Sequence, residues 1–226
     1  MANVPALSLL ETRVIGVLLE KQHTVPDTYP LTLNALAAGC NQKTSRDPVI
    51  EAAETEVQAA IDRLKSLSLV MESSGGRVMR YAQNLGKVLG IPPQSAALLA
   101  VLFLRGPQTA GELRIHSDRL HKFGDILSVE AFLNELAERK DGALVVELGK
   151  APGARETRWA HLLSGAPAVP AQAVIPAQAV IPAKAGTQPM DASDVQARID
   201  RLEAEVATLR EAVARLSNAS GSDSSG

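Results

Sequence analysis

The residues best suited to covalent or metal chemistry are one cysteine and four histidines, namely Cys40, His23, His116, His121 and His161. A cysteine nucleophile needs a base held beside it, and a zinc site needs several Cys or His ligands at short spacings. None of the histidines lies in a recognisable signature of either kind. Cys40 ends an apolar stretch, which is typical of a core position. The sequence therefore predicts no enzyme, no metal and no cofactor.

The segment CNQKTSRDPV, Cys40–Val49, is almost devoid of apolar side chains between its two ends. Two interpretations of it stay open. In the first, its short polar side chains cap backbone groups and the segment is a self-satisfied structural loop. In the second, Asn41, Gln42, Lys43 and Arg46 present donors to phosphates or base edges of a nucleic acid.

Composition limits the class of protein. The 226 residues include 46% hydrophobic and 21% charged residues, and the net charge is −2. Residues 1–90 and 91–165 each carry equal numbers of basic and acidic side chains, so neither half is basic. This weakens a simple electrostatic case for nucleic acid, where a clustered basic surface is expected. No apolar run approaches the ~20 residues of a membrane helix, and the N-terminus lacks signal-peptide features. We expect a cytoplasmic protein without a membrane partner.

The elements that would position these side chains follow one pattern twice. Helical spacing of apolar residues predicts helices over 8–22, 31–40 and 51–67 and then over 94–106, 109–120 and 128–139. Turn signals predict a β-hairpin after each set, over 69–82 and 143–162. Ser8 with Glu11, and Thr109 with Glu112, have the spacing of capping boxes. Three helices followed by a hairpin is the winged helix-turn-helix plan.

The predicted fold class is mainly α with small β-hairpins. We expect two tandem winged helix-turn-helix domains, then a disordered linker and a C-terminal coiled-coil helix. The boundaries are 1–90, 91–165, 166–190, 191–218 and a disordered tail over 219–226. The linker assignment rests on prolines that recur every six residues in PAQAVIPAQAVIPAKAG, since proline disrupts helices and sheet interiors.

The C-terminal segment has a heptad repeat. Its apolar positions are Val195, Ile199, Leu202, Val206, Leu209, Val213 and Leu216. β-branched residues at one core position and leucine at most of the other favour a parallel two-stranded coil. We therefore expect a homodimer; a single amphipathic helix docked on the body is the alternative.

Winged helices usually read DNA with the third helix and touch its backbone with the hairpin. Both predicted third helices are rich in glutamate, which repels phosphate. The hairpins are more favourable, and their basic residues are Arg77, Arg80, Lys150, Arg155 and Arg158. With the four polar residues of the Cys40–Val49 segment, they form the predicted nucleic-acid contact set.

The stretches ETRVIGVLLEK, TYPLTLNALAAGCNQKTSRDPV, LRGPQTAGELR and PGARETRWAHLLSG resemble the YceH-like family of uncharacterised bacterial proteins. The similarity runs from about Leu7 to Gly165. The resemblance implies tandem winged-helix modules and brings no catalytic residue with it. We expect a DNA-associated protein, a transcriptional regulator, that binds double-stranded DNA as a homodimer. The alternative is a winged-helix module that binds a protein partner and no DNA.

The heptad repeat generates a first prediction. Leu202→Pro together with Leu209→Pro removes two core leucines and breaks the helix at both sites. Static light scattering should then report the mass of one chain, where the unaltered protein gives twice that mass. An unchanged mass would remove the coiled-coil interpretation.

Overall fold

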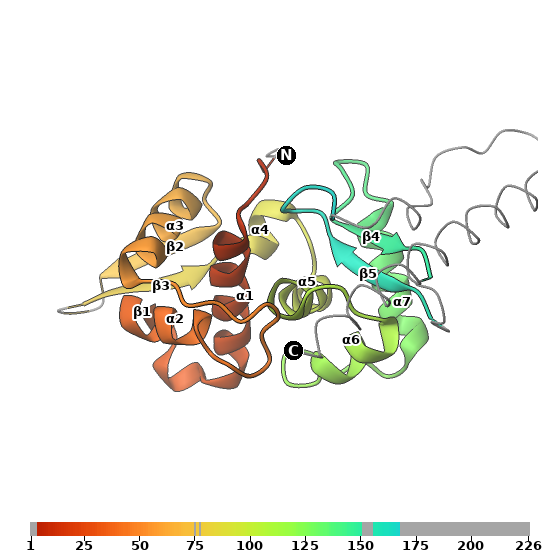
Figure 1. The fold of residues 1–226 in the computed structure, drawn as a ribbon, viewed down its shortest axis with the longest axis horizontal. Coiled ribbons are helices and arrows are strands. Elements are labelled where there is room, and N and C mark those ends of the chain that lie inside the picture. The colour runs from red at the N-terminus through yellow and green to blue at the C-terminus, as the bar shows by residue number, and fades with distance from the viewer. Residues whose placement is uncertain (1–3, 75, 77, 151–155, 168–226) are drawn as a thin grey trace, which may run out of the picture. The chain divides into compact units, whose positions relative to one another are not determined.

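A computed structural model describes residues 4–74, 76, 78–150 and 156–167 of the chain. The described part is mainly helical with two small antiparallel sheets, an architecture compatible with a winged helix (Figure 1). The predicted coiled-coil helix and the linker from residue 168 onward lie outside it, so both stay predictions. Among the described residues, no helix is long and apolar enough to cross a membrane.

The first set of elements encloses a three-stranded sheet. In chain order it comprises α1 (Leu9–Thr24), the 3-10 turn η1 (Pro26–Thr28), β1 (Leu31–Thr32), α2 (Leu33–Cys40), α3 (Glu54–Ser66), β2 (Val70–Ser74) and β3 (Met79–Gln83). The strands run antiparallel in the order β1-β3-β2. Tyr81 lies at the centre of the register, opposite Leu31 on one side and Glu72 on the other.

The short helix α4 (Leu85–Leu89) connects the first set to a second one, which repeats the order of three helices and a hairpin. The second set comprises α5 (Pro93–Arg105), α6 (Ala110–His116), α7 (Ile126–Ala137), β4 (Val145–Leu148) and β5 (Arg158–His161). β4 and β5 are antiparallel. An isolated antiparallel bridge joins Gln108 to Trp159 of β5, in the place where β1 joins β3 in the first set.

Helix boundaries confirm the local signals of the sequence. The Ser8 amide donates to Glu11 at 2.7 Å, and the Glu11 amide donates to the Ser8 hydroxyl at 3.2 Å. The same reciprocal pair joins Thr109 and Glu112 at 2.9 and 3.1 Å. Both predicted capping boxes are therefore present.

Several element boundaries differ from the sequence prediction; α6, for example, ends at His116 rather than at residue 120. Three of the differences concern where an element begins. Residues 31–32 form β1 rather than the start of a helix, because Thr32 is the N-cap of α2 and its hydroxyl accepts from the Ala35 amide. α3 begins at Glu54 rather than at residue 51. α7 begins at Ile126, capped by the Asp125 carboxylate, which accepts from the Ser128 amide at 2.8 Å.

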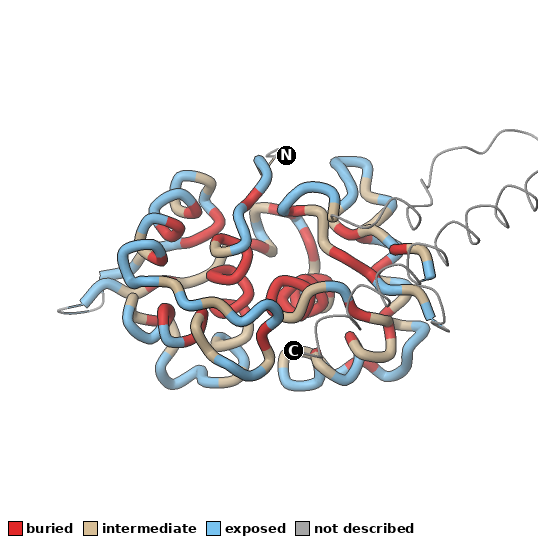
Figure 2. Tube along the Cα trace, viewed as in Figure 1, coloured by how far each residue is buried: buried red, intermediate tan, exposed pale blue. Residues whose placement is uncertain are grey.

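The two sets pack on each other through α1 and α5, the helices with the most mutual contact. Both are buried along most of their length (Figure 2). Gly16 permits their close approach, because a β-carbon there would lie 3.0 Å from the Leu104 side chain and 3.1 Å from Phe103 Cβ. One continuous cluster of buried residues runs through both sets.

His161 of β5 is partly buried against Phe103 of this cluster and is a neutral imidazole. Its ring meets the edge of Phe103 with ring centres 4.9 Å apart, and its Nδ1 is buried without a hydrogen-bond partner among the described residues. Burial lowers the pKa of His161 to about 4.

This burial predicts that stability depends on pH. Between pH ~6.5 and ~4 the His161 side chain is protonated in the unfolded chain but not in the folded one. The free energy of unfolding therefore decreases as the pH falls through that window. The loss reaches roughly 3 kcal/mol, from ~1.4 kcal/mol per pKa unit. Urea unfolding of the His161→Phe variant should show a shallower loss of stability than the unaltered protein. The exposed His23→Gln variant is the control and should keep the original slope; identical slopes in all three proteins would contradict the assignment.

Candidate functional site

The Cys40–Val49 loop lies between the two halves of the described structure. It leaves the end of α2 and reaches α5, where the Asp47 amide donates to the Leu104 carbonyl at 2.8 Å. The Ser45 hydroxyl accepts from the Arg105 guanidinium at 2.7 Å. The loop therefore ties the first set of elements to α5.

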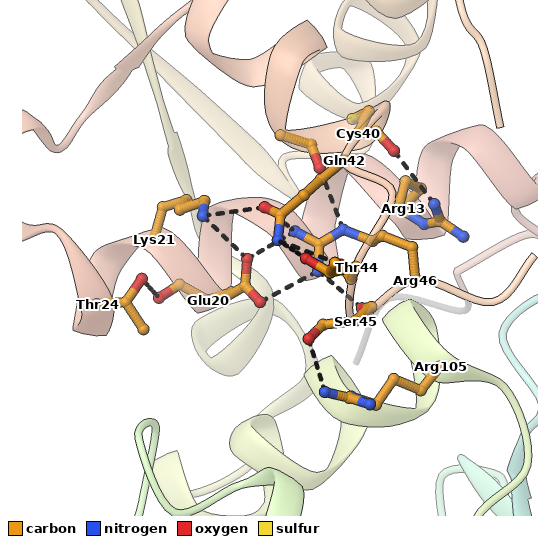
Figure 3. A network of polar contacts seen from close by, with 11 residues as sticks. Arg13, Glu20, Lys21, Thr24, Cys40, Gln42, Thr44, Ser45, Arg46 and Arg105 are labelled. Atoms are coloured by element: carbon orange, nitrogen blue, oxygen red, sulfur yellow. Dashed lines mark hydrogen bonds and ion pairs between the residues drawn. The ribbon is translucent and has the colours of Figure 1, made fainter. Parts of the chain in front are cut away.

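Arg46 is the centre of this loop, and its side chain is completely buried. Its guanidinium donates to both carboxylate oxygens of Glu20 on α1, at 3.1 and 2.7 Å, and to the Gly39 and Ser45 carbonyls (Figure 3). Burial raises the pKa of Glu20, but the hydrogen bonds and charge of Arg46 lower it by more, so the carboxylate stays ionised. We call Glu20, Gln42, Ser45, Arg46 and Arg105 the loop network.

A second buried arginine donates hydrogen bonds to the backbone of the loop. Arg13 of α1 is fully buried and donates to the Cys40 carbonyl at 3.2 Å and to the Pro48 carbonyl at 2.7 Å. Burial, followed by the charge of Arg46, lowers the pKa of Arg13. Because these two carbonyls lie near the two ends of the loop, Arg13 fixes its span.

The other loop residues of the predicted contact set differ in their availability. The Asn41 amide group bonds the backbone of Ala52 twice, once as donor and once as acceptor, both at 2.8 Å. This clamp holds the chain extended just before α3, which explains the late start of that helix. Gln42 donates to Thr44 within the loop. Lys43 is exposed.

The hairpin cations are divided between protein contacts and solvent. Arg80 of β3 donates to the Thr28 and Pro30 carbonyls at 3.2 and 2.7 Å. Arg158 of β5 pairs with Glu112 at 3.2 Å and donates to the Pro107 carbonyl. Lys150 is exposed. Arg77 and Arg155 lie outside the described residues.

The described members of the predicted contact set are therefore not brought to one surface. The four loop residues lie beside α1 and α5. β3 contacts α1 and β5 contacts α5, so the two hairpins lie on either side of that helix pair (Figure 1). The Arg46 side chain is buried, and Arg80 donates through one Nη to two backbone carbonyls.

Cys40 is buried in the apolar core, as the sequence indicates. Burial raises the pKa of its thiol to about 12, so the thiol stays protonated at neutral pH and is a poor nucleophile. Within the described residues, no group of three or more His, Cys, Asp or Glu side chains has a geometry that could hold a metal ion.

Three members of these contacts were not anticipated: Arg13, Glu20 and Arg105. Each lies in a stretch with helical periodicity, and nothing in the local pattern marks it as a partner of a loop 20 to 60 residues away. A signal is present only for Arg13, a charged side chain inside an otherwise apolar run of α1.

The buried pair generates a stability prediction. Arg46→Ala leaves the Glu20 carboxylate without its main partner in a largely buried position, which should cost about 3–5 kcal/mol in free energy of unfolding. Lys43→Ala removes an exposed cation from the same loop and should change stability by no more than about 0.5 kcal/mol. Chemical denaturation of both variants measures the difference. Equal, small effects would show that Arg46 is not part of the folded core.

Comparison with known proteins places the chain in a family. The model of the family described as "Protein of unknown function, DUF480" matches residues 7–154. A UPF0502 protein of Dechloromonas aromatica is 59% identical over 208 residues, which cover 92% of this chain and 94% of that protein. A UPF0502 protein of Leptothrix cholodnii is 54% identical over 215 residues, covering 95% and 96%.

A third relative, a UPF0502 protein of Burkholderia thailandensis, is 53% identical over 220 residues, 97% of this chain and 92% of that protein. These matches confirm the YceH-like resemblance seen in the sequence. The chain belongs to the DUF480 family of bacterial proteins.

Proposed function

We propose that this protein is a non-enzymatic protein-interaction module built on two winged-helix units. The order α1-β1-α2-α3-β2-β3 and the sheet order β1-β3-β2 support the first unit. The repeated order from α5 to β5, with the Gln108–Trp159 bridge in the place of β1, supports the second.

One observation carries the proposal: α7 begins with two exposed apolar side chains. Ile126 is 45% exposed and Leu127 is 72% exposed. In a helix-turn-helix protein that reads DNA, the N-terminal residues of the second helix contact base edges with hydrogen-bonding groups. Ile126 and Leu127 have no such groups, and water is an unfavourable environment for them. Contact with an apolar partner surface satisfies both.

The apolar surface extends onto α6. The Ile126 side chain lies 3.9 Å from the β-carbon position of Gly111. Ile115 follows Gly111 by one helical turn on the same face of α6 and is 69% exposed. We call Ile115, Ile126 and Leu127 the α6–α7 patch.

The exposed stripe of α7 changes character along the helix. From Leu127 it continues at helical spacing through Ala131 to Glu135 and Glu138, all exposed. α7 itself contains no Lys or Arg. A complementary partner therefore packs an apolar side chain against the patch and places Lys or Arg side chains beside Glu135 and Glu138.

The first unit agrees with this proposal. The corresponding helix α3 begins with Glu54, Thr55 and Glu56, all exposed. Carboxylates at this position suit the N-terminus of a helix but repel the phosphates of DNA.

DNA association is the second candidate, in the form of a coiled-coil homodimer and transcriptional regulator. It is favoured by the exposed Lys43 and Lys150, neither of which has a carboxylate within 4 Å among the described residues. Arg77 and Arg155 belong to the same hypothesis from the sequence.

The α6–α7 patch predicts the effect of one substitution on partner binding. Leu127→Lys places a charge at the centre of the patch and should weaken partner binding at least tenfold, since buried apolar anchors dominate interface energetics. Val78→Lys, an exposed apolar residue of the other unit's hairpin, is the matched control and should bind normally. The partner is first recovered from cells of the source bacterium and then titrated as a purified protein.

Two outcomes contradict the proposal. The first is a partner that binds the Leu127→Lys and Val78→Lys variants equally well. The second is tight binding of the unaltered protein to random duplex DNA, with an affinity that falls steeply as salt rises, because such a slope reports phosphate contacts. Since Leu127 is exposed, its replacement should leave the free energy of unfolding within about 0.5 kcal/mol.

A further inference from the structure

A small polar pocket lies where the loop network meets α5 and α6. Its volume is about 150 Å³, and the charged or hydrogen-bonding side chains on its wall include Lys21, Gln42, Ser45, Arg105, His116 and Arg119. Lys21 is on α1, Gln42 and Ser45 are in the Cys40–Val49 loop, and the other three come from α5, α6 and the residues after α6. We call it the seam pocket, because both sets of elements contribute to it.

Positive charge on its wall exceeds negative charge. Among the described residues, Glu20 is the one acidic residue that lines the pocket. Both of its carboxylate oxygens already bond Arg46, and Lys21 lies 3.4 Å from one of them. The Glu20 carboxylate thus lies beside two cations, Arg46 and Lys21. Arg105 and Arg119 on the pocket wall add two further positive charges.

The remaining guanidinium groups have no acidic partner in the described part of the chain. Arg105 donates to the neutral Ser45 hydroxyl at 2.7 Å, and no carboxylate of a described residue lies within 4 Å of Arg105 or Arg119. Arg105 is half-buried, so its charge is only partly screened by water.

His116 adds a group that responds to charge. Its Nδ1 lies 2.8 Å from the Gln108 side-chain oxygen, so in the neutral ring Nδ1 carries the proton and Nε2 is free to gain one. Burial, followed by the charge of Arg105, lowers the pKa of His116, while Glu112 raises it slightly.

We propose that the seam pocket binds a small phosphate-bearing anion, held by the guanidinium groups of Arg105 and Arg119 and the ammonium of Lys21. A guanidinium group can donate two parallel hydrogen bonds to two oxygens of a phosphoryl group. The Ser45 and Gln42 side chains add hydrogen-bonding groups, and the total exceeds what the two oxygens of a carboxylate accept. The inference is independent of the proposed protein-interaction function, because the α6–α7 patch and the seam pocket share no residue.

Calorimetric titration of the full chain with inorganic pyrophosphate tests the proposal. We expect saturable binding of one anion per chain. Arg119→Gln should weaken it at least tenfold, and Lys21→Gln should weaken it as well. Arg119 is exposed and its replacement spares the loop network, so the variant should fold normally. Arg114→Gln is the matched control: it removes one exposed positive charge from α6, outside the pocket, and should change the affinity by less than twofold.

A second measurement locates the anion. An NMR titration of the protein saturated with pyrophosphate should show a raised pKa for His116, because a nearby anion favours the imidazolium form. The exposed His23, which does not line the pocket, should be unaffected. The proposal is overturned if no saturable binding occurs, if Arg114→Gln weakens binding as much as Arg119→Gln, or if only duplex DNA binds.

Discussion

Close packing of α1 against α5 is the constraint on which the other features depend. Gly16 brings the two helices together at Leu104 and Phe103. The next residues of α5 are then near enough for the Asp47 amide to bond the Leu104 carbonyl and for Arg105 to bond Ser45. The loop network and the seam pocket both exist because these helices fix the distance between the first set of elements and α5.

Buried charge explains why Arg46, a member of the predicted contact set, is not free to bind a ligand. A guanidinium removed from water has to find acceptors inside the protein, and Arg46 and Arg13 find them in Glu20 and in loop carbonyls. Arg80 and Arg158 are likewise engaged at the hairpins. The surface at the starts of α3 and α7 is acidic or apolar, and on this ground we propose protein contact.

Sequence patterns predict the elements that depend on neighbours in the chain and miss those that depend on distant ones. Capping boxes at Ser8 and Thr109 depend on a residue three positions away and are correctly predicted. β1 has only two residues and is a strand because it pairs with Arg80 and Tyr81 of β3. The five-residue α4 is too short for a periodic signal, and the first residue of α3 depends on the Asn41 clamp on Ala52.

The candidate site shows the same limit. Its polar side chains do satisfy backbone groups, which a loop of that composition indicates, yet the partners of Arg46 and Ser45 come from helices that no local pattern identifies. The hydrogen bonds of Arg46 inside the protein also affect the charge at its surface. Because Arg46 occupies both oxygens of Glu20, that carboxylate cannot fully neutralise Lys21, and the positive charge of Lys21 and Arg105 remains directed at the seam pocket. A structural loop thereby creates a surface charge that an anion can use.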